Sequence, residues 1–185
     1  YKYVDLILGK QCQTKMGRGG IHPLEFKTFS KEMQNAITNY CQAGGNFFVS
    51  GAYVASDLWD NRLVKANEED KKFAMEVLKY KWRVGQAARN GKVKSVASPF
   101  PEITGSYTYY QDLNPESYVV ESPDALEPAA QGAFTILRYS ENNLSAGIAY
   151  KGNYKTCVLG FPFEAIRTVT ERELLMKAIL TFFEH

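Results

Sequence analysis

Residues 29–60, FSKEMQNAITNYCQAGGNFFVSGAYVASDLWD, decide the fold that the sequence predicts. The first part of this stretch repeats apolar side chains at the i, i+4, i+7 and i+8 spacing, which predicts an amphipathic helix whose core face carries Met33, Ile37, Tyr40 and Cys41. The Gly44-Gly45 pair ends the helix, because glycine readily adopts the left-handed backbone. The apolar run at 46–49 then predicts a strand that is covered on both faces.

A glycine turn, residues 50–53 (SGAY), follows this strand directly. A second buried strand is predicted at residues 4–8, before the helix, and it ends at Gly9. Two buried strands joined by a helix almost always form a right-handed parallel unit, so we expect strands 4–8 and 47–49 to lie side by side and parallel. Ligands of α/β sheets bind at the carboxyl ends of the strands, which makes the turn a candidate site.

The rest of the chain extends this unit. Residues 82–96 predict a hairpin that turns at Asn90-Gly91. Three strand-like runs at 134–140, 144–151 and 154–161 predict an antiparallel meander, and Thr170 with Glu173 forms a capping box for a closing helix. The sequence therefore predicts one domain over residues 1–185: a three-layer α/β, flavodoxin-like fold with a mainly parallel sheet and an antiparallel hairpin and meander extension.

Composition narrows the class of function. The net charge of +2, with acidic and basic residues interspersed, argues against a nucleic-acid surface. No apolar run approaches the roughly 20 residues that cross a bilayer, so we expect no membrane span. The three cysteines match no metal motif, and Cys41 and Cys157 are predicted to be buried free thiols. Because the chain opens at Tyr1 rather than Met, we expect a piece of a longer multidomain protein.

Two segments together resemble a known family. The strand ending at Gly9, the helix-Gly-Gly-strand unit and SGAY resemble the middle of class I glutamine amidotransferase-like domains, and residues 158–164 (VLGFPFE) resemble the segment that carries their catalytic His-Pro-Glu. Three sequence segments, VDLILGKQ, AGGNFFVSGAYVASDLWD and GFPFEAI, are most similar to the amidotransferase-like domain of secreted bacterial proteins described as xanthan lyase-related. The resemblance implies an extracellular, periplasmic or cell-surface location, with polysaccharide and other domains of the parent chain as partners.

The sequence departs from this family at the catalytic residues. Ser50, Gly51 and Ala52 stand where the family has its cysteine, Pro162 or Phe163 stands where it has its histidine, and Glu164 alone matches. A cysteine nucleophile needs a neighbouring imidazole to form the thiolate. The sequence therefore predicts a non-catalytic accessory or binding domain connected with glycans, without a cofactor, whose candidate binding residues are Ser50, Gly51, Tyr53, Asp57 and Glu164.

Enzymatic alternatives stay open from the residues. Ser50 is a candidate nucleophile of a hydrolase, with His22 as its base, and Glu164 is the other catalytic candidate. A polysaccharide lyase would instead use Tyr53 with an arginine. A metal site would use Asp57, Asp60 and Glu164. An enzyme should have a deep pocket with polar groups around these residues, whereas a binding domain should have the crevice filled by Tyr and Phe.

Overall fold

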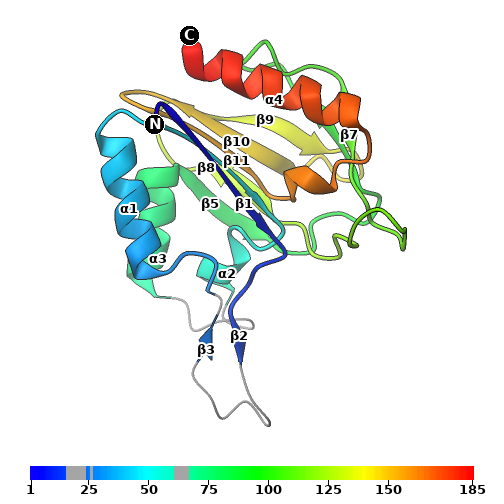
Figure 1. The fold of residues 1–185 in the computed structure, drawn as a ribbon, viewed down its shortest axis with the longest axis horizontal. Coiled ribbons are helices and arrows are strands. Elements are labelled where there is room, and N and C mark those ends of the chain that lie inside the picture. Colours follow the sequence, from blue (N-terminus) through cyan, green and yellow to red (C-terminus); the bar gives the residue numbers. More distant parts are fainter. Residues whose placement is uncertain (16–23, 26, 61–66) are drawn as a thin grey trace.

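A curled seven-stranded sheet forms the centre of the molecule (Figure 1). The computed structural model describes residues 1–15, 24–25, 27–60 and 67–185. In spatial order the strands of this sheet are β1 (Tyr3–Gly9), β4 (Asn46–Gly51), β11 (Lys155–Leu159), β10 (Ser145–Lys151), β9 (Ala133–Tyr139), β6 (Lys92–Ser95) and β7 (Ser106–Thr108). Two small ribbons accompany it: β2 (Thr14–Lys15) with β3 (Leu24–Glu25), and β5 (Tyr80–Val84) with β8 (Ala125–Pro128).

The predicted parallel pair is confirmed. Strand β1 runs parallel to β4, with Tyr3 opposite Asn46 and Leu6 opposite Val49, and β4 runs parallel to β11. Strand β1 nevertheless lies at the edge of the sheet rather than inside it, and Ile7 is 51% exposed. One side of β1 is therefore without a strand partner among the described residues.

The predicted fold class is wrong. Beyond β11 every pairing of the central sheet is antiparallel, which leaves two parallel pairings against four antiparallel ones in the described sheet. A parallel neighbour needs a crossover of a dozen or more residues, usually a helix, and residues 79–162 contain no helix. The molecule is thus a mixed, half-barrel sheet with few helices, and the flavodoxin-like, mainly parallel α/β description does not hold.

The meander of β9, β10 and β11 is confirmed, but the hairpin at residues 82–96 is wrong. Strand β5 pairs with β8, about forty residues away, while β6 inserts between β9 and β7. Between them Ala87 and Ala88 are buried, and the Ala87 N–H donates to the Pro123 carbonyl. The segment before Asn90-Gly91 therefore packs into the core instead of returning directly as a second hairpin arm.

Helices cover the two faces of the sheet (Figure 1). Helix α1 (Lys31–Gln42) and the continuous helix formed by α3 (Glu68–Lys72) and the π-helical segment η2 (Phe73–Leu78) pack on one face. Helix α4 (Val169–Glu184) packs on the other. Its cap is formed by Thr168 and Glu171, two residues before the predicted pair: the Glu171 N–H donates to the Thr168 hydroxyl, which in turn donates to the Glu171 carboxylate. The residue before this cap, Arg167, donates its N–H to the Thr108 carbonyl instead.

The prediction for the cysteines is confirmed. Cys12, Cys41 and Cys157 are all free, and the last two are fully buried. Burial raises the pKa of the Cys41 thiol to about 12 and that of Cys157 further, so both thiols stay protonated and unreactive. Within the described ranges, no helix has the length and apolar character that crossing a bilayer requires.

Phe48 of β4 should be one of the most costly positions to truncate. Its side chain is 1% exposed and meets the Phe163 ring edge-on at 5.7 Å between centroids. Phe48→Ala should lower the free energy of unfolding by about 3–5 kcal/mol, since it removes a buried aromatic ring and leaves a cavity. Urea unfolding measures this. Leu113→Ala is the control, because Leu113 is 94% exposed; equal losses for the two variants would contradict the placement of Phe48.

Candidate functional site

The predicted site lies where β1, β4 and β11 end, next to the short helix η3 (Phe163–Ala165). Gly9 closes β1 with φ +57°, and a Cβ there would stand 3.3 Å from both the Glu164 carboxylate and the Tyr118 hydroxyl. Gly160, after β11, comes so close to the Asp124 carbonyl that an added Cβ would lie 2.0 Å from its oxygen. The strand ends are therefore packed directly against the segments that cover them.

Ser50 is sealed inside the protein. Its side chain is fully buried, and its Oγ accepts a hydrogen bond from the Phe163 N–H at 3.2 Å. Phe163 stands where a catalytic histidine was sought, and it is also buried. Ser50 thus ties the end of β4 to η3 through the backbone of Phe163, whose ring packs edge-on against Phe48.

Glu164 is the centre of a polar cluster on the surface beside β1, which we call the Glu164 cluster (Asp5, Lys10, Tyr118 and Glu164). Its Oε1 accepts the Tyr118 hydroxyl at 2.5 Å, and its Oε2 is buried with no hydrogen-bond partner among the described residues. Partial burial and the nearby Glu164 charge raise the pKa of Asp5 to about 6. Burial, followed by the interaction with Glu164, raises the pKa of Tyr118.

Lys10 supplies the positive charge of this cluster. Its ammonium lies 2.6 Å from the Glu121 carboxylate and 5.7 Å from the centroid of the Tyr118 ring. A cation over the ring face is attracted by the π electrons, so Lys10 and Tyr118 hold each other in place. The cluster therefore combines two carboxyl groups, a phenol and an ammonium, with Asp5 within the edge strand β1 and the other three groups near the end of that strand.

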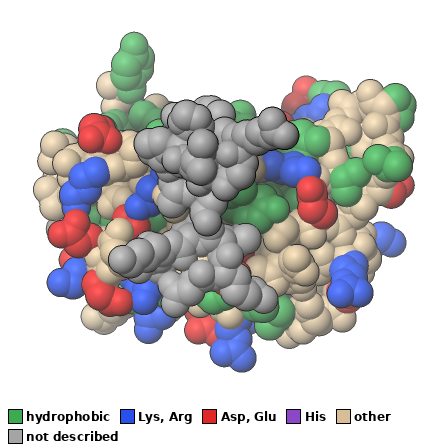
Figure 2. All heavy atoms as spheres, turned by 90° about the horizontal axis from the view of Figure 1, so that it is seen from below, with side chains coloured by type: hydrophobic (Ala, Val, Ile, Leu, Met, Phe, Trp, Pro, Cys, Tyr) green, Lys and Arg blue, Asp and Glu red, His purple; other side chains and the backbone are tan. Residues whose placement is uncertain are grey.

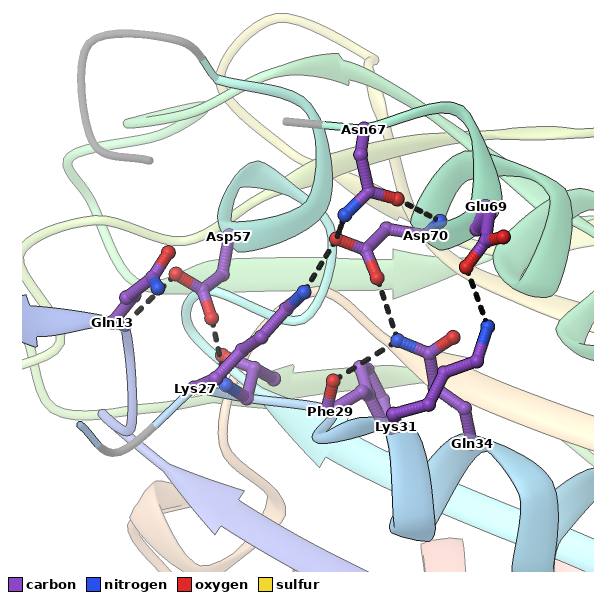
Figure 3. Close-up of polar contacts among 10 residues, drawn as sticks. Gln13, Lys27, Phe29, Lys31, Gln34, Asp57, Asn67, Glu69 and Asp70 are labelled. Carbon is purple, nitrogen blue, oxygen red and sulfur yellow. Dashed lines mark hydrogen bonds and ion pairs between the residues drawn. The ribbon is translucent and has the colours of Figure 1, made fainter. Parts of the chain in front are cut away.

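Asp57 has a structural role instead (Figure 3). Its side chain is fully buried, with Oδ1 accepting the Gln13 N–H at 2.8 Å and Oδ2 accepting the Thr28 N–H at 2.7 Å. Asp57 belongs to the short helix α2 (Ser56–Trp59), so these two hydrogen bonds fasten the backbone at Gln13 and at Thr28 to that helix. Both carboxylate oxygens are occupied, so Asp57 is not available to a ligand.

Asp70, also drawn in Figure 3, likewise accepts hydrogen bonds on both carboxylate oxygens. It accepts hydrogen bonds from Lys27 at 2.5 Å, Asn67 at 2.8 Å and Gln34 at 2.7 Å.

Among the described residues no group of three histidine, cysteine or carboxylate side chains is placed to hold a metal ion. The metal set of Asp57, Asp60 and Glu164 is therefore not assembled, and His22, the predicted base for Ser50, lies outside the described residues.

Tyr53 and Gly51 remain close to the strand ends. Tyr53 is half-buried; burial raises the pKa of its hydroxyl, and a hydrogen bond with Ser122 partly offsets this. Gly51 is buried against Leu8, whose Cβ would stand 3.0 Å from an added Cβ. Of the five predicted binding residues, only Tyr53 and Glu164 keep part of their side chains at the surface.

Sequence reasoning missed Asp124, a second fully buried carboxylate near the site. It accepts hydrogen bonds from the backbone N–H groups of Ala55 and Ser56, from the Ser56 hydroxyl and from the Trp82 indole. Burial raises its pKa to about 7, while these four donors pull the pKa down. Asp124 therefore joins the Ser122–Asp124 loop to the first turn of α2, where only the fold brings its donors together.

Asp5 and Tyr118 were also missed, although Asp5 had a signal. It is a charged residue inside the apolar run of β1, and it faces the α4 side of the sheet.

The surface seen in Figure 2 shows lysine, arginine and acidic side chains interspersed on the described residues, without a patch of one sign. A separate shallow groove of about 540 Å³ runs along α4 and reaches Phe163.

Comparison with known proteins adds the fold but no family. No family model matches the chain, and no curated protein matches it either. A solved β-galactosidase from Rahnella sp. R3 is similar over 100% of this chain, with 13% identity and a TM-score of 0.59. This chain spans 23% of the length of that β-galactosidase.

A second solved structure, the mmIFT52 N-terminal domain, aligns over 84% of this chain and 72% of the mmIFT52 chain, at 14% identity and a TM-score of 0.42. At these identities the β-galactosidase likeness establishes the fold alone, and the weaker one supports no argument. Neither structure is described as an amidotransferase, so the comparisons lend no support to that description.

Asp5 should titrate with a pKa near 6 in carbon-detected NMR of the folded protein. Glu164→Gln should lower this pKa, because it removes a negative charge, but not to the ordinary 3.8, because burial remains. Glu121→Gln is the matched control and should leave Asp5 unchanged. An Asp5 pKa that does not respond to Glu164→Gln would contradict the electrostatic interaction between the two carboxyl groups.

The raised pKa values of Asp5 and Asp124 determine how the free energy of unfolding changes with pH. Folding raises the pKa of Asp5 to about 6 and that of Asp124 to about 7, both above the unfolded value. A carboxyl group of this kind binds its proton more tightly in the folded state, so its contribution is complete below about pH 4. That contribution is lost as the pH rises through 6 for Asp5 and through 7 for Asp124.

Asp124→Ala should destabilise the protein by about 3 kcal/mol or more, since each buried donor left unpaired costs about 1–3 kcal/mol. Glu121→Ala is the comparison: it removes a nearby carboxylate that is 55% exposed and ion-paired with Lys10, and a surface pair contributes about 0–1 kcal/mol. Thermal unfolding at one pH measures both. Equal effects would show that the Asp124 donors are satisfied in another way.

Proposed function

We propose that this chain is a non-catalytic binding domain of a glycan-related protein, and that it works beside other domains of the same parent chain. The observation that carries this proposal is the state of Ser50. Its Oγ is buried and accepts a hydrogen bond from the Phe163 N–H, and Phe163 is a residue that cannot act as a base. A substrate carbonyl has no room to approach the hydroxyl there.

Chemistry supports the same proposal. A serine becomes a nucleophile when a base within hydrogen-bond reach takes its proton. The group that contacts Ser50 is a peptide N–H, which donates a hydrogen bond and cannot accept a proton. With neither access nor a base at Ser50 among the described residues, a hydrolase mechanism through this serine is disfavoured.

The glycan part of the proposal rests on two supports. The fold recurs as a minor part of a β-galactosidase chain, a protein whose described activity is on a carbohydrate. The segments VDLILGKQ, AGGNFFVSGAYVASDLWD and GFPFEAI resemble domains of secreted bacterial proteins described as xanthan lyase-related. An extracellular or periplasmic location, and polysaccharide as partner, belong to the proposal on the same grounds.

An enzyme remains the second candidate because of one observation, the Asp5 and Glu164 pair. Glycoside hydrolysis uses two carboxyl groups, one of which has a raised pKa and acts as the acid. Asp5, within β1, has a pKa of about 6, and the Glu164 carboxylate, beside Gly9 at the end of the same strand, is close enough to raise it. An activity of this chain would therefore depend on these residues rather than on Ser50.

The deciding experiment measures turnover and binding on the same preparations. Purified wild-type protein, Ser50→Ala and Glu164→Gln are assayed for glutamine hydrolysis and for hydrolysis of an aryl β-galactoside, and binding to a polysaccharide panel is measured by affinity electrophoresis. We expect no turnover with either substrate and retention by at least one polysaccharide. Turnover lost in Glu164→Gln would establish the enzymatic alternative, and turnover lost in Ser50→Ala would make Ser50 a nucleophile.

Ser50→Ala should leave polysaccharide binding unchanged. It should lower the free energy of unfolding by about 1–3 kcal/mol, because the buried Phe163 N–H loses its acceptor. Binding that falls while the variant remains folded would place Ser50 in a ligand site and contradict its sealed position.

A further inference from the structure

Two arginines from strands far apart in the sequence line one small cleft. The cleft has a volume of about 180 Å³ and lies between the β5–β8 ribbon and the β9–β10 part of the sheet. Arg83 and Arg138 border it, Thr135 and Ser145 add hydroxyl groups, and Glu127 adds a carboxylate. The cleft lies away from the Glu164 cluster and shares none of its residues.

Irregular strand pairing accompanies both arginines. In the β5–β8 ribbon Trp82 pairs with Leu126 and Val84 pairs with the next residue, Ala125, so Arg83 is the extra residue of a β-bulge. On the sheet side Arg138 pairs with Ser145, and the register shifts immediately beyond this pair. Bulges of this kind redirect a side chain and are common beside binding sites.

Arg138 has no charge partner among the residues that the structure describes. Its Nη1 donates to the Asn143 carbonyl at 2.7 Å, which holds the guanidinium in place, and within the described residues no carboxylate pairs with it. Lys94 is its cross-strand partner on β6. Like charges opposite each other are destabilising, and a bound anion would relieve this repulsion.

Arg83 is paired only loosely. Its Nε lies 3.6 Å from the Glu127 carboxylate, and the two side chains are 62% and 50% exposed. Within the described residues its terminal Nη groups make no hydrogen bond, so their donors stay free for a ligand. Glu127 is the one acidic group lining the cleft, which leaves the lining with a net positive charge.

We propose that this cleft binds a single oxyanion group, and that in the protein's own ligand this group is the carboxylate of an acidic sugar. Guanidinium groups bind planar carboxylates through paired N–H donors, and the hydroxyls of Thr135 and Ser145 supply further polar contacts. The oxyanion site follows from the cleft itself. Its assignment to an acidic glycan rests on the function proposed above.

The test compares three probes: polygalacturonate, a neutral galactan and inorganic phosphate. Binding is measured by isothermal titration calorimetry for the wild type, Arg138→Gln, Arg83→Gln and Glu127→Gln. The arginine variants should bind polygalacturonate at least tenfold more weakly. Glu127→Gln should bind it several-fold more tightly, because it removes the acidic group that repels the anion.

Lys177→Gln is the matched control, since it makes the same charge change on exposed α4, across the sheet, and should have no effect. Arg83 is mostly exposed, so Arg83→Gln keeps the test valid if Arg138→Gln does not fold. Circular dichroism and thermal unfolding verify the fold of each variant.

The outcomes separate this inference from the proposed function. Binding of polygalacturonate that follows the three cleft variants supports both. Polysaccharide binding that none of them alters upholds the glycan function and overturns the cleft. Phosphate binding that follows the variants, without polysaccharide binding, upholds the oxyanion site and removes the glycan function. Absence of binding to all three probes overturns both.

Discussion

Strand β4 is the constraint on which the rest of the structure depends, because both halves of the core meet on it. Phe48 faces the cluster under α4, whereas Phe47 and Val49 face the cluster under α1 and η2. Alternate residues of a strand point to opposite faces, so one short apolar run serves both. Its two parallel neighbours, β1 and β11, align their carboxyl ends with its own, and this alignment creates the only place where loops from three parallel strands meet in the described sheet.

Buried carboxylates organise those loops. Asp57 and Asp70 accept hydrogen bonds from the segments around Gln13, Lys27 and Thr28, and Asp124 holds the first turn of α2. A buried charge is costly unless donors surround it, and each of these carboxylates has such donors. The acidic residues at the strand ends thus shape the loops, which explains why so few of them are open to a ligand.

The polar groups that are more open form two separate clusters. The Glu164 cluster sits at the end of the edge strand β1, and the Arg83–Arg138 cleft lies under the β5–β8 ribbon. The two differ in charge: the first has two carboxyl groups, the second two guanidinium groups. By contrast, the interior at Ser50 is occupied by Phe163 and Phe48.

The sequence by itself determined the local units. Helix α1 with its Gly-Gly end, the parallel β1–β4 pair, the β9–β10–β11 meander and the buried thiols all follow from periodicity, turn residues and short connections, which act between neighbours in the chain. For the site, Glu164 and Tyr53 were placed near the strand ends correctly. Only the tertiary structure decided that β5 pairs with β8, that β6 enters between β9 and β7, and that Asp5, Tyr118, Arg83 and Arg138 reach their partners. The physical reason is that backbone hydrogen bonds accept any strand as partner, so the choice between distant strands depends on how their side chains fill one shared core.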